Sequence, residues 1–176
     1  MWPFSKKKEG AAEAGEAKPK SGPEVYHGMR EFALKTKPED IGLNAKPGEP
    51  YGVLMDLATS SGSATLMTMC EGSVSIYYSG GGGLLGGVGH DSVRNAGLAL
   101  IAAAGDYLTL MQTTQSFPLP KQNHVRFYVL TPEAVHTYEA NWDALGNNHD
   151  PLSPLFHLGD NVITQFRLVS EKQGHG

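Results

Sequence analysis

A glycine-rich stretch over residues 79–94 joins the most strand-like run of the sequence to its most helix-like run. Before it, residues 73–79 alternate between apolar and polar side chains, and a period of two is typical of a half-buried strand. After it, apolar residues recur every three or four positions over residues 91–111, which predicts a helix with Asp91 as its N-cap. The chain therefore has to combine a sheet with a helix that packs closely against it.

Other parts of the sequence show the same strand-like pattern. Five segments predict strands: residues 51–58, 64–70, 73–79, 125–131 and a stretch through Tyr138 and Ala140 that ends before Trp142. Short turns join the first three, so we expect an antiparallel meander. The second is apolar on both sides, as a central strand covered on each face would be. The last could instead be a helix, because Val135, Tyr138, Trp142 and Leu145 have helical spacing.

Three further segments predict helices. Residues 25–36 predict a short helix with Met29, Phe32, Ala33 and Val25 on one side. Residues 37–41 predict the start of a second helix, which Gly42 ends. A C-terminal helix is expected to begin with Ser153 as N-cap and Pro154 at its first position. Gly159 would interrupt it, and Asp160 would cap its second part.

Together these segments predict one α+β domain over residues 24–176, with an antiparallel sheet of about five strands in a two-layer arrangement: a three-strand meander, a helix, a hairpin and a C-terminal helix. Residues 1–23 are rich in Ala, Gly, Glu, Lys and Pro, and this composition predicts a disordered tail.

Charge and cysteine content bear on two questions: whether the chain binds nucleic acid, and in which compartment it resides. Residues 1–23 carry five lysines and three glutamates, a net charge of +2, which leaves −6 on the remaining chain. An acidic domain argues against nucleic-acid binding. A single cysteine, Cys70, allows no disulfide within one chain and suggests a cytoplasmic protein.

The tail has one possible role at a membrane surface. No run in the sequence is long and apolar enough to span a bilayer. The residues that could touch an anionic membrane are Trp2, Phe4, Lys6, Lys7 and Lys8. Three lysines contribute only about 3 kcal/mol near such a surface, so we expect at most weak peripheral contact.

The glycine-rich junction is the main candidate for ligand binding, since a strand, a glycine turn and a helix N-terminus can cradle an anion. The residues concerned are Gly86, Gly87, Gly89, His90, Ser92 and Arg94. Asp91 would repel a phosphate and the loop has no lysine, so packing is the favoured interpretation. Arg94 lies in the first helical turn, where a cation needs a partner: a nearby carboxylate or a bound anion.

Asp56 is the second candidate, because it lies within an apolar strand and needs a partner if its face is covered; Arg94 or Arg126 could supply one. A structural ion pair is favoured over the alternative, a pocket wall with a perturbed carboxylate. We predict no catalytic residue, metal site or cofactor. His90, Asp91 and Ser92 contain the types of a catalytic triad, but as neighbours at a helix start they cannot easily align. The spacing of the other histidines matches no common zinc pattern.

Three runs resemble an uncharacterised family of small bacterial proteins: Tyr51-Gly52-Val53-Leu54-Met55-Asp56, the junction Gly86-Gly87-Val88-Gly89-His90-Asp91-Ser92-Val93-Arg94, and Leu145-Gly146-Asn147-Asn148 followed by Pro151-Leu152-Ser153-Pro154-Leu155-Phe156. The resemblance would cover roughly residues 29–167 and implies no activity. It favours the hairpin over residues 134–140. The order of elements also resembles profilin-like and roadblock-like folds, by analogy only.

The sequence therefore leaves two candidate functions. The first is a non-enzymatic interaction module in the bacterial cytoplasm, acting on a protein partner or as a homo-oligomer. The alternative is a small anionic-ligand-binding protein or hydrolase that uses the glycine-rich junction.

Overall fold

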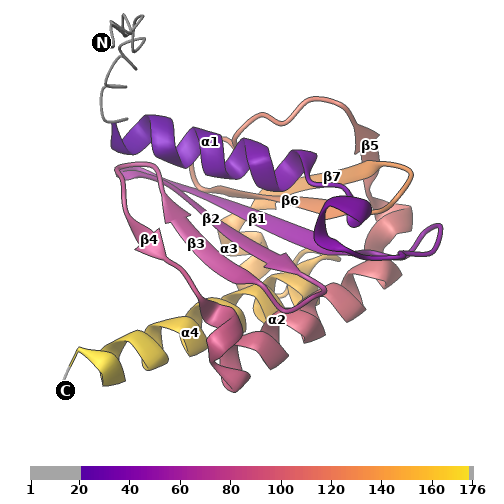
Figure 1. The fold of residues 1–176 in the computed structure, drawn as a ribbon. Coiled ribbons are helices and arrows are strands. Elements are labelled where there is room, and N and C mark those ends of the chain that lie inside the picture. The colour runs from indigo at the N-terminus through magenta and orange to yellow at the C-terminus, as the bar shows by residue number, and fades with distance from the viewer. Residues whose placement is uncertain (1–20, 175–176) are drawn as a thin grey trace, which may run out of the picture.

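The computed structural model describes residues 21–174 as one antiparallel sheet with helices on both faces (Figure 1). The strands are β1 (Gly52–Thr59), β2 (Gly62–Met69), β3 (Val74–Tyr78), β4 (Gly83–Leu84), β5 (Gln112–Thr114), β6 (His124–Leu130) and β7 (Val135–Asn141). The α-helices are α1 (Gly22–Lys35), α2 (Asp91–Ala104), α3 (Trp142–Gly146) and α4 (Ser153–Gln173). Three 3-10 helices complete the fold: η1 (Pro38–Ile41), η2 (Gly87–Gly89) and η3 (Gly105–Leu110).

The sheet has the strand order β4-β3-β2-β1-β6-β7-β5. The α+β class and the antiparallel sheet are confirmed, and β1, β2, β3, β6 and β7 are the five expected strands. The expected number was too low, because the sheet has seven strands. β4 and β5 have two and three residues, too few for an alternating pattern to show in the sequence. The hairpin reading of β7 is confirmed, and that strand ends at Asn141.

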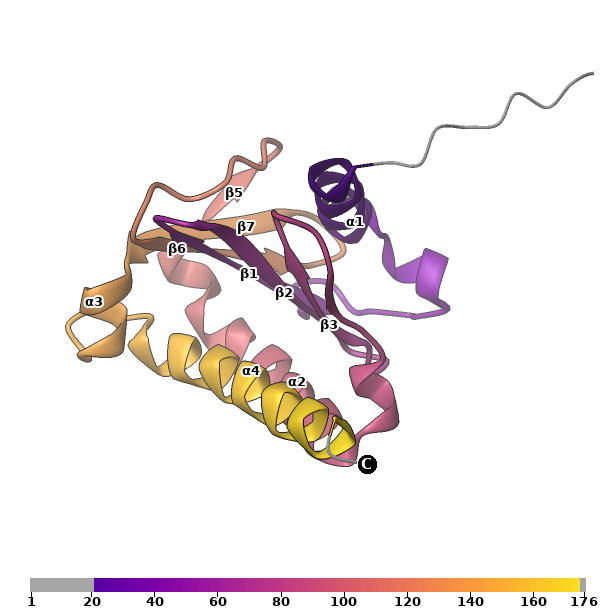
Figure 2. The same cartoon turned by 90° about the vertical axis from the view of Figure 1, so that its left-hand side faces the viewer.

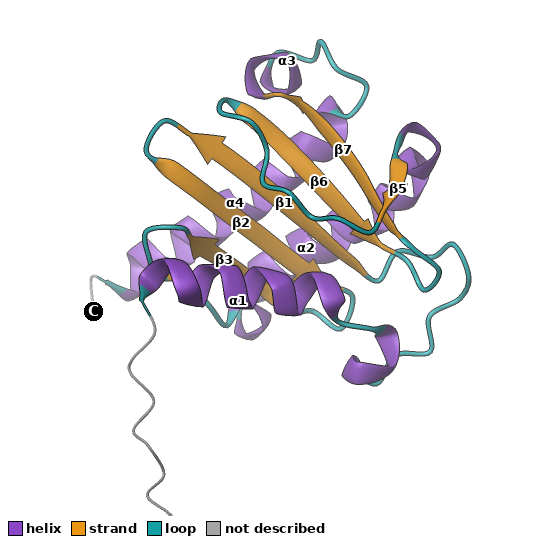
Figure 3. Cartoon of the chain, turned by 90° about the horizontal axis from the view of Figure 1, so that it is seen from above, coloured by secondary structure: helices purple, strands orange, loops and turns teal. Residues whose placement is uncertain are grey.

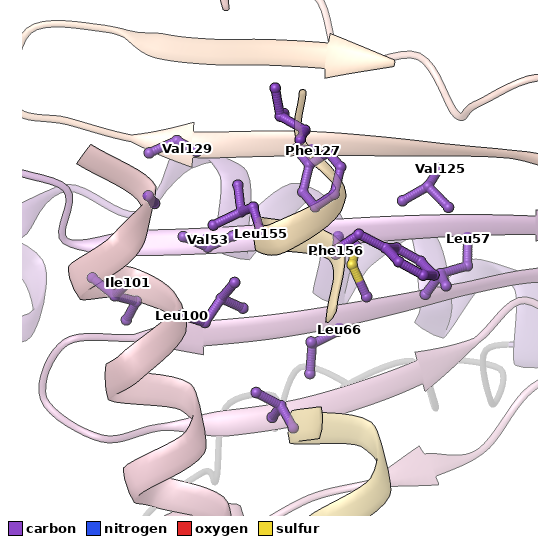
Figure 4. Close-up of a cluster of buried hydrophobic side chains, with 14 of the residues drawn as sticks. Val53, Leu57, Leu66, Leu100, Ile101, Val125, Phe127, Val129, Leu155 and Phe156 are labelled. Carbon is purple, nitrogen blue, oxygen red and sulfur yellow. The ribbon is translucent and has the colours of Figure 1, made fainter. Parts of the chain in front are cut away.

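Helices cover both faces of the sheet, so the expectation of only two layers was wrong. α2 and α4 lie on one face, and α1 crosses the other (Figures 1 and 2). Val53 and Met55 of β1 pack in the cluster beneath α2 and α4, whereas Leu54 packs on the α1 side. Because neighbouring strand residues point to opposite faces, β1 is buried on both. Figure 4 shows part of the larger cluster, where Phe127 of β6 and Leu155 of α4 lie over the middle of the sheet.

Two helix predictions need correction at their ends. α2 ends at Ala104 and the chain continues as η3 to Leu110, rather than as one helix to residue 111. The N-cap of α2 is His90, and Asp91 is the first residue of the helix. A carboxylate in this first turn still faces the positive end of the helix dipole.

The C-terminal helix also differs in two details from its prediction. Its N-cap is Leu152, with Ser153 as the first residue. Gly159 does not interrupt α4, which is continuous to Gln173. A Cβ at Gly159 would lie 2.7 Å from Sδ of Met55, so the missing side chain lets α4 approach β1 closely.

α1 begins earlier than expected and buries a different set of residues. Ser21 caps the helix together with Glu24, so the last residues of the predicted tail are structured. The remaining tail, with the predicted membrane contact through Trp2, Phe4 and the lysines, lies outside the described residues. The buried side of α1 consists of Tyr26, Arg30, Ala33 and Leu34. Of the apolar residues expected on one side, only Ala33 faces the sheet.

Candidate functional site

The residues of the glycine-rich junction lie together, between β4 and the first turn of α2. Gly86 adopts a φ of 77°, a left-handed conformation that favours glycine, and it turns the chain into η2. Gly87 is buried, and a Cβ there would lie 2.8 Å from Val93 of α2 and 2.9 Å from Val74 of β3. The centre of the junction is therefore filled by packing between η2, β3 and α2.

The polar residues of the junction bind other parts of the same chain. The Arg94 guanidinium donates a 2.8 Å hydrogen bond to Oδ1 of Asp91, which is 83% exposed. The expected partner of Arg94 was either a nearby carboxylate or a bound anion. In the structure the partner is the carboxylate of Asp91. The His90 ring lies 3.4 Å from the Gln173 amide at the end of α4, and Ser92 is exposed.

Asp56 does not join these residues, because it lies on the opposite face of the sheet, beneath α1. It is fully buried, and its Oδ2 accepts hydrogen bonds from Nε of Arg30 at 2.9 Å and from Nη2 at 2.6 Å. The Thr65 hydroxyl donates to Oδ1 at 2.5 Å. The Tyr26 hydroxyl lies 2.9 Å from Thr65, which links the cluster to α1 a second time. The carboxylate is thus paired on both oxygens, as a buried charge requires.

The expected partners of Asp56, Arg94 and Arg126, were wrong. Arg94 is held at the start of α2, on the other side of the sheet. Arg126 stands opposite Asp56 in the register of β1 and β6, but its guanidinium pairs with Glu139 of β7. The true partner, Arg30, comes from a helix that passes over the sheet.

Arg30 also holds a long loop against the sheet. Residues 115–123 run across the face that α1 leaves open (Figure 3). Nη1 of Arg30 donates to the carbonyl of Phe117 at 2.9 Å, and Nη2 to that of Pro118 at 3.3 Å. The Tyr128 hydroxyl donates to the same Pro118 carbonyl at 2.6 Å, and the Arg30 guanidinium lies 5.4 Å from the Tyr128 ring centre. One side chain thus fastens α1, β1 and this loop together.

The electrostatics of this cluster suit a structural ion pair. Burial raises the pKa of the Asp56 carboxyl, and the hydrogen bonds from Arg30 and Thr65 oppose that rise. Burial also raises the pKa values of Tyr26 and Tyr128. A substrate could not reach a carboxylate with no exposed surface, so we assign the cluster a role in folding.

A cleft of 420 Å³ opens at the end of the sheet where the β1–β2 turn approaches α4. Ser79 and Gly80, at the start of the glycine-rich stretch, line it, whereas the six predicted junction residues do not. Its walls include Leu57, Tyr78, Trp142 and Ile163. The hydroxyls of Thr59 and Ser61 bind each other, and that of Ser79 accepts from the Ser63 amide. These hydroxyls serve the turns around the cleft, and the one charged side chain in its wall is that of Asp160 of α4.

The outward side of α1 carries two exposed large apolar side chains, which lie among the exposed charged residues Glu24, Glu31 and Lys35. We call Val25, Gly28 and Phe32 the α1 outer face. Val25 is 45% exposed and Phe32 is 74% exposed, the most exposed large apolar side chain in the described part of the chain. A Cβ at Gly28 would meet nothing within 4 Å. A shallow groove between α1 and η1 borders this face, with Phe32, Thr36 and Asp40 in its wall.

Sequence reasoning missed both Arg30 and the orientation of α1. A signal was present for Arg30, since it stands four residues after Tyr26 and four before Leu34, which places all three on one side of a helix. That side faces the sheet because its arginine meets a buried carboxylate there. Val25 and Phe32 consequently face outward.

Among residues 21–174, no group of three or more His, Cys, Asp and Glu side chains could hold a metal ion. No helix within that range is both long and apolar enough to cross a membrane. The chain matches no family model, and no curated protein or solved structure matches it, so its function has to be argued from its own geometry.

Proposed function

We propose that this chain is a non-enzymatic interaction module that binds a protein partner through the α1 outer face. The observation that carries the proposal is the exposure of Phe32, at 74%, on a helix whose other side is already anchored to the sheet. Val25 lies seven residues, or two helical turns, before Phe32, so the two apolar side chains share one stripe. Exposed apolar patches on soluble domains commonly mark sites of protein contact.

The charged groups described above support a binding role over a catalytic one. Asp56 is inaccessible and fully paired, and Arg94 is paired with Asp91. The alternative, binding of a small anion at the glycine-rich junction, has less support because Gly87 is packed and the arginine has a carboxylate partner. The cytoplasmic location, the bacterial family and the profilin-like or roadblock-like order of elements remain proposals from the sequence.

Site-specific photo-crosslinking tests this function in cells that produce the full chain. A benzophenone amino acid replaces Phe32 in one variant and Leu168 of α4, which is 40% exposed on another face, in the matched control. We expect a crosslinked adduct from position 32 and none from position 168. Val25→Glu in the same chain should abolish the adduct. The proposal is refuted if position 32 gives no adduct, or gives one that the substitution leaves unchanged.

A further inference from the structure

We infer that the cleft between the end of the sheet and α4 binds a small organic amine, with the protonated nitrogen at Asp160 and the apolar part on the floor of the cleft. The cleft lies on the side of the sheet that α2 and α4 cover, whereas α1 crosses the other side (Figure 2). This site is therefore separate from the α1 outer face, and its test is independent of the protein contact proposed above.

The floor of the cleft is a row of side chains across three neighbouring strands. Leu57 of β1 stands opposite Ala64 of β2, and Ala64 stands opposite Tyr78 of β3. Directly opposed residues of antiparallel strands point to the same face of the sheet, which here is the face that carries α4. Ala64 has the shortest side chain of the three, so it leaves a hollow between two larger neighbours. The sheet side of the cleft is therefore an apolar hollow.

α4 supplies the wall opposite this floor. Gly159 lets the helix approach β1 closely, because a Cβ there would lie 2.7 Å from Sδ of Met55. The next residue, Asp160, lines the cleft together with Ile163. These two are three positions apart, so they lie on the same side of the helix. The close contact at Gly159 fixes where α4 lies over the sheet, and it thereby holds the Asp160 carboxylate at the cleft.

Two aromatic rings complete the walls. Trp142, the first residue of α3, is half-buried, and the centre of its ring lies 6.4 Å from that of Phe156 of α4 in an edge-to-face arrangement. Tyr78 is 42% exposed, so its ring is open to a ligand. Aromatic faces attract cations such as an ammonium group, in addition to the apolar surface that they offer. The cleft thus suits a ligand that is both apolar and positively charged.

The charge of the cleft favours a cation over an anion. Among residues 21–174, no lysine, arginine or histidine forms an ion pair with the Asp160 carboxylate. The nearest basic residues on α4 have other partners: Arg167 pairs with Glu171, and the His157 ring lies 3.0 Å from the side-chain oxygen of Asn148. The chain beyond residue 23 carries a net charge of −6, so its field attracts an amine and repels an anion.

The size of the cleft and its single charge narrow the class of amine. Its volume of 420 Å³ lies within the range of small-molecule sites, about 300–1,000 Å³. A second ammonium group would find no second carboxylate, since Asp160 is the one charged side chain in the wall. A monoamine with one aromatic ring or a short alkyl chain therefore matches the cleft better than a polyamine does.

Tryptophan fluorescence tests the site in the full-length protein with Trp2→Phe, which leaves Trp142 as the only tryptophan. The probe is 2-phenylethylamine, which is protonated at neutral pH, and its uncharged analogue is 2-phenylethanol. We expect the amine to change the Trp142 emission with a dissociation constant of about 0.1–1 mM, as a fragment-sized ligand would. The alcohol should bind about three- to tenfold more weakly, because it has no charge to meet the carboxylate or the aromatic faces.

Substitution of the carboxylate is the decisive step. Asp160→Asn should weaken the binding of the amine about three- to tenfold and leave that of the alcohol unchanged. Asp160 is exposed, so the variant should keep its fold. The matched control, Glu71→Gln, removes an exposed carboxylate from the turn at the other end of β2 and should leave both affinities unchanged. Equal affinity of the amine for the wild type and for Asp160→Asn would overturn the proposal, as would no binding of 2-phenylethylamine at about 10 mM.

A substitution in the floor tests the position of the ligand. Ala64→Leu fills the hollow between Leu57 and Tyr78, so it should weaken the binding of both compounds at least about threefold. Circular dichroism checks that this variant folds. If it does not fold, Tyr78→Ser removes part of the same floor at an exposed position and should have the same effect. Unchanged affinities in a folded floor variant would overturn the assignment of the ligand to this cleft.

Discussion

Removal of Arg30 should destabilise the domain severely, and removal of Asp56 at the same time should restore most of the loss. Arg30→Met leaves the Asp56 carboxylate buried without its cation, and it also takes donors from the carbonyls of Phe117 and Pro118. Asp56→Leu leaves the guanidinium beneath α1 without an anion. In the double variant neither charge is buried, so the largest cost of each single substitution disappears.

The magnitude follows from the geometry. Breaking a buried pair by removing one partner costs about 3–5 kcal/mol, so the two single changes together amount to about 6–10 kcal/mol. Replacing both partners with apolar residues is neutral or stabilising by about 1–4 kcal/mol. The two lost carbonyl contacts of Arg30 offset this gain, at about 1 kcal/mol each. We therefore expect the double variant within about 2 kcal/mol of the wild type, and a coupling energy above about 4 kcal/mol.

Urea unfolding followed by circular dichroism measures the three variants and the wild type in one cycle. The exposed pair of Arg94 and Asp91 is the matched control, and its coupling should stay below about 1 kcal/mol because solvent screens it. If a single variant does not fold, a cooperative unfolding transition in the double variant still shows that removing the second charge restores stability. A double variant as unstable as the sum of the two single variants would refute the reasoning.

Further substitutions and conditions test other parts of the structure. Gly28→Ala should stabilise the monomer by about 0.5–1 kcal/mol in urea unfolding, because the site is open and helical, and a loss would contradict the exposed position of that side of α1. Gly87→Ala should instead cost about 1–3 kcal/mol in the same assay, because its Cβ would lie 2.9 Å from both Cβ and the backbone oxygen of Val74; equal effects at both glycines would refute the close packing of η2 on β3. Above about pH 10 the unfolded chain should lose its tyrosine protons before the folded chain, since burial raises the pKa of Tyr26. The stability that the Tyr26 hydroxyl proton contributes is fully present below about pH 10 and is lost as the pH rises through the raised pKa of Tyr26. The urea midpoint should drop over the same pH range, and absorbance at 295 nm follows the tyrosine ionisation. Inorganic phosphate should leave the melting temperatures of the wild type and of Arg94→Ala unchanged; a rise in the wild type alone would favour the anion-binding alternative.

The sequence predicted the parts of the fold that have a regular pattern over several residues. The strands expected over residues 73–79 and 125–131 correspond to β3 and β6. The expectation that the first of them is half-buried was wrong, because four of the five residues of β3 are buried and both of its faces are covered. β4 escaped prediction since two residues cannot show a period, and its pairing depends on the backbone of Gly83 lying against Ile76. The end of α2 could not be predicted from the sequence pattern either, because residues 105–110 keep a helical spacing while their hydrogen bonds change to the 3-10 type.

The candidate site was harder to predict because its partners come from segments far apart in the chain. Asp56 needed a cation, and Arg94 and Arg126 were expected to supply it, but the partner, Arg30, depended on which helix covers that face of β1. The junction was easier, since the partner of Arg94 is three residues away on the same helix. Local spacing can identify such a pair, whereas a contact across 26 residues depends on the arrangement of the whole sheet.

The anchoring of α1 and the exposure of its outer face have one cause. A single helix can present only one side to the sheet, and the pair formed by Arg30 and Asp56 fixes which side that is. Rotating α1 to bury Phe32 would withdraw the guanidinium from a carboxylate with no exposed surface, and that cost exceeds the about 1.5–3 kcal/mol gained by burying one large apolar side chain. The fold therefore keeps an apolar stripe in solvent, and a second protein surface can bury that stripe without disturbing the ion pair. A chain in which Arg30→Met and Asp56→Leu are combined has lost this constraint, so it should give less of the photo-crosslinked adduct at position 32 as well as near-native stability.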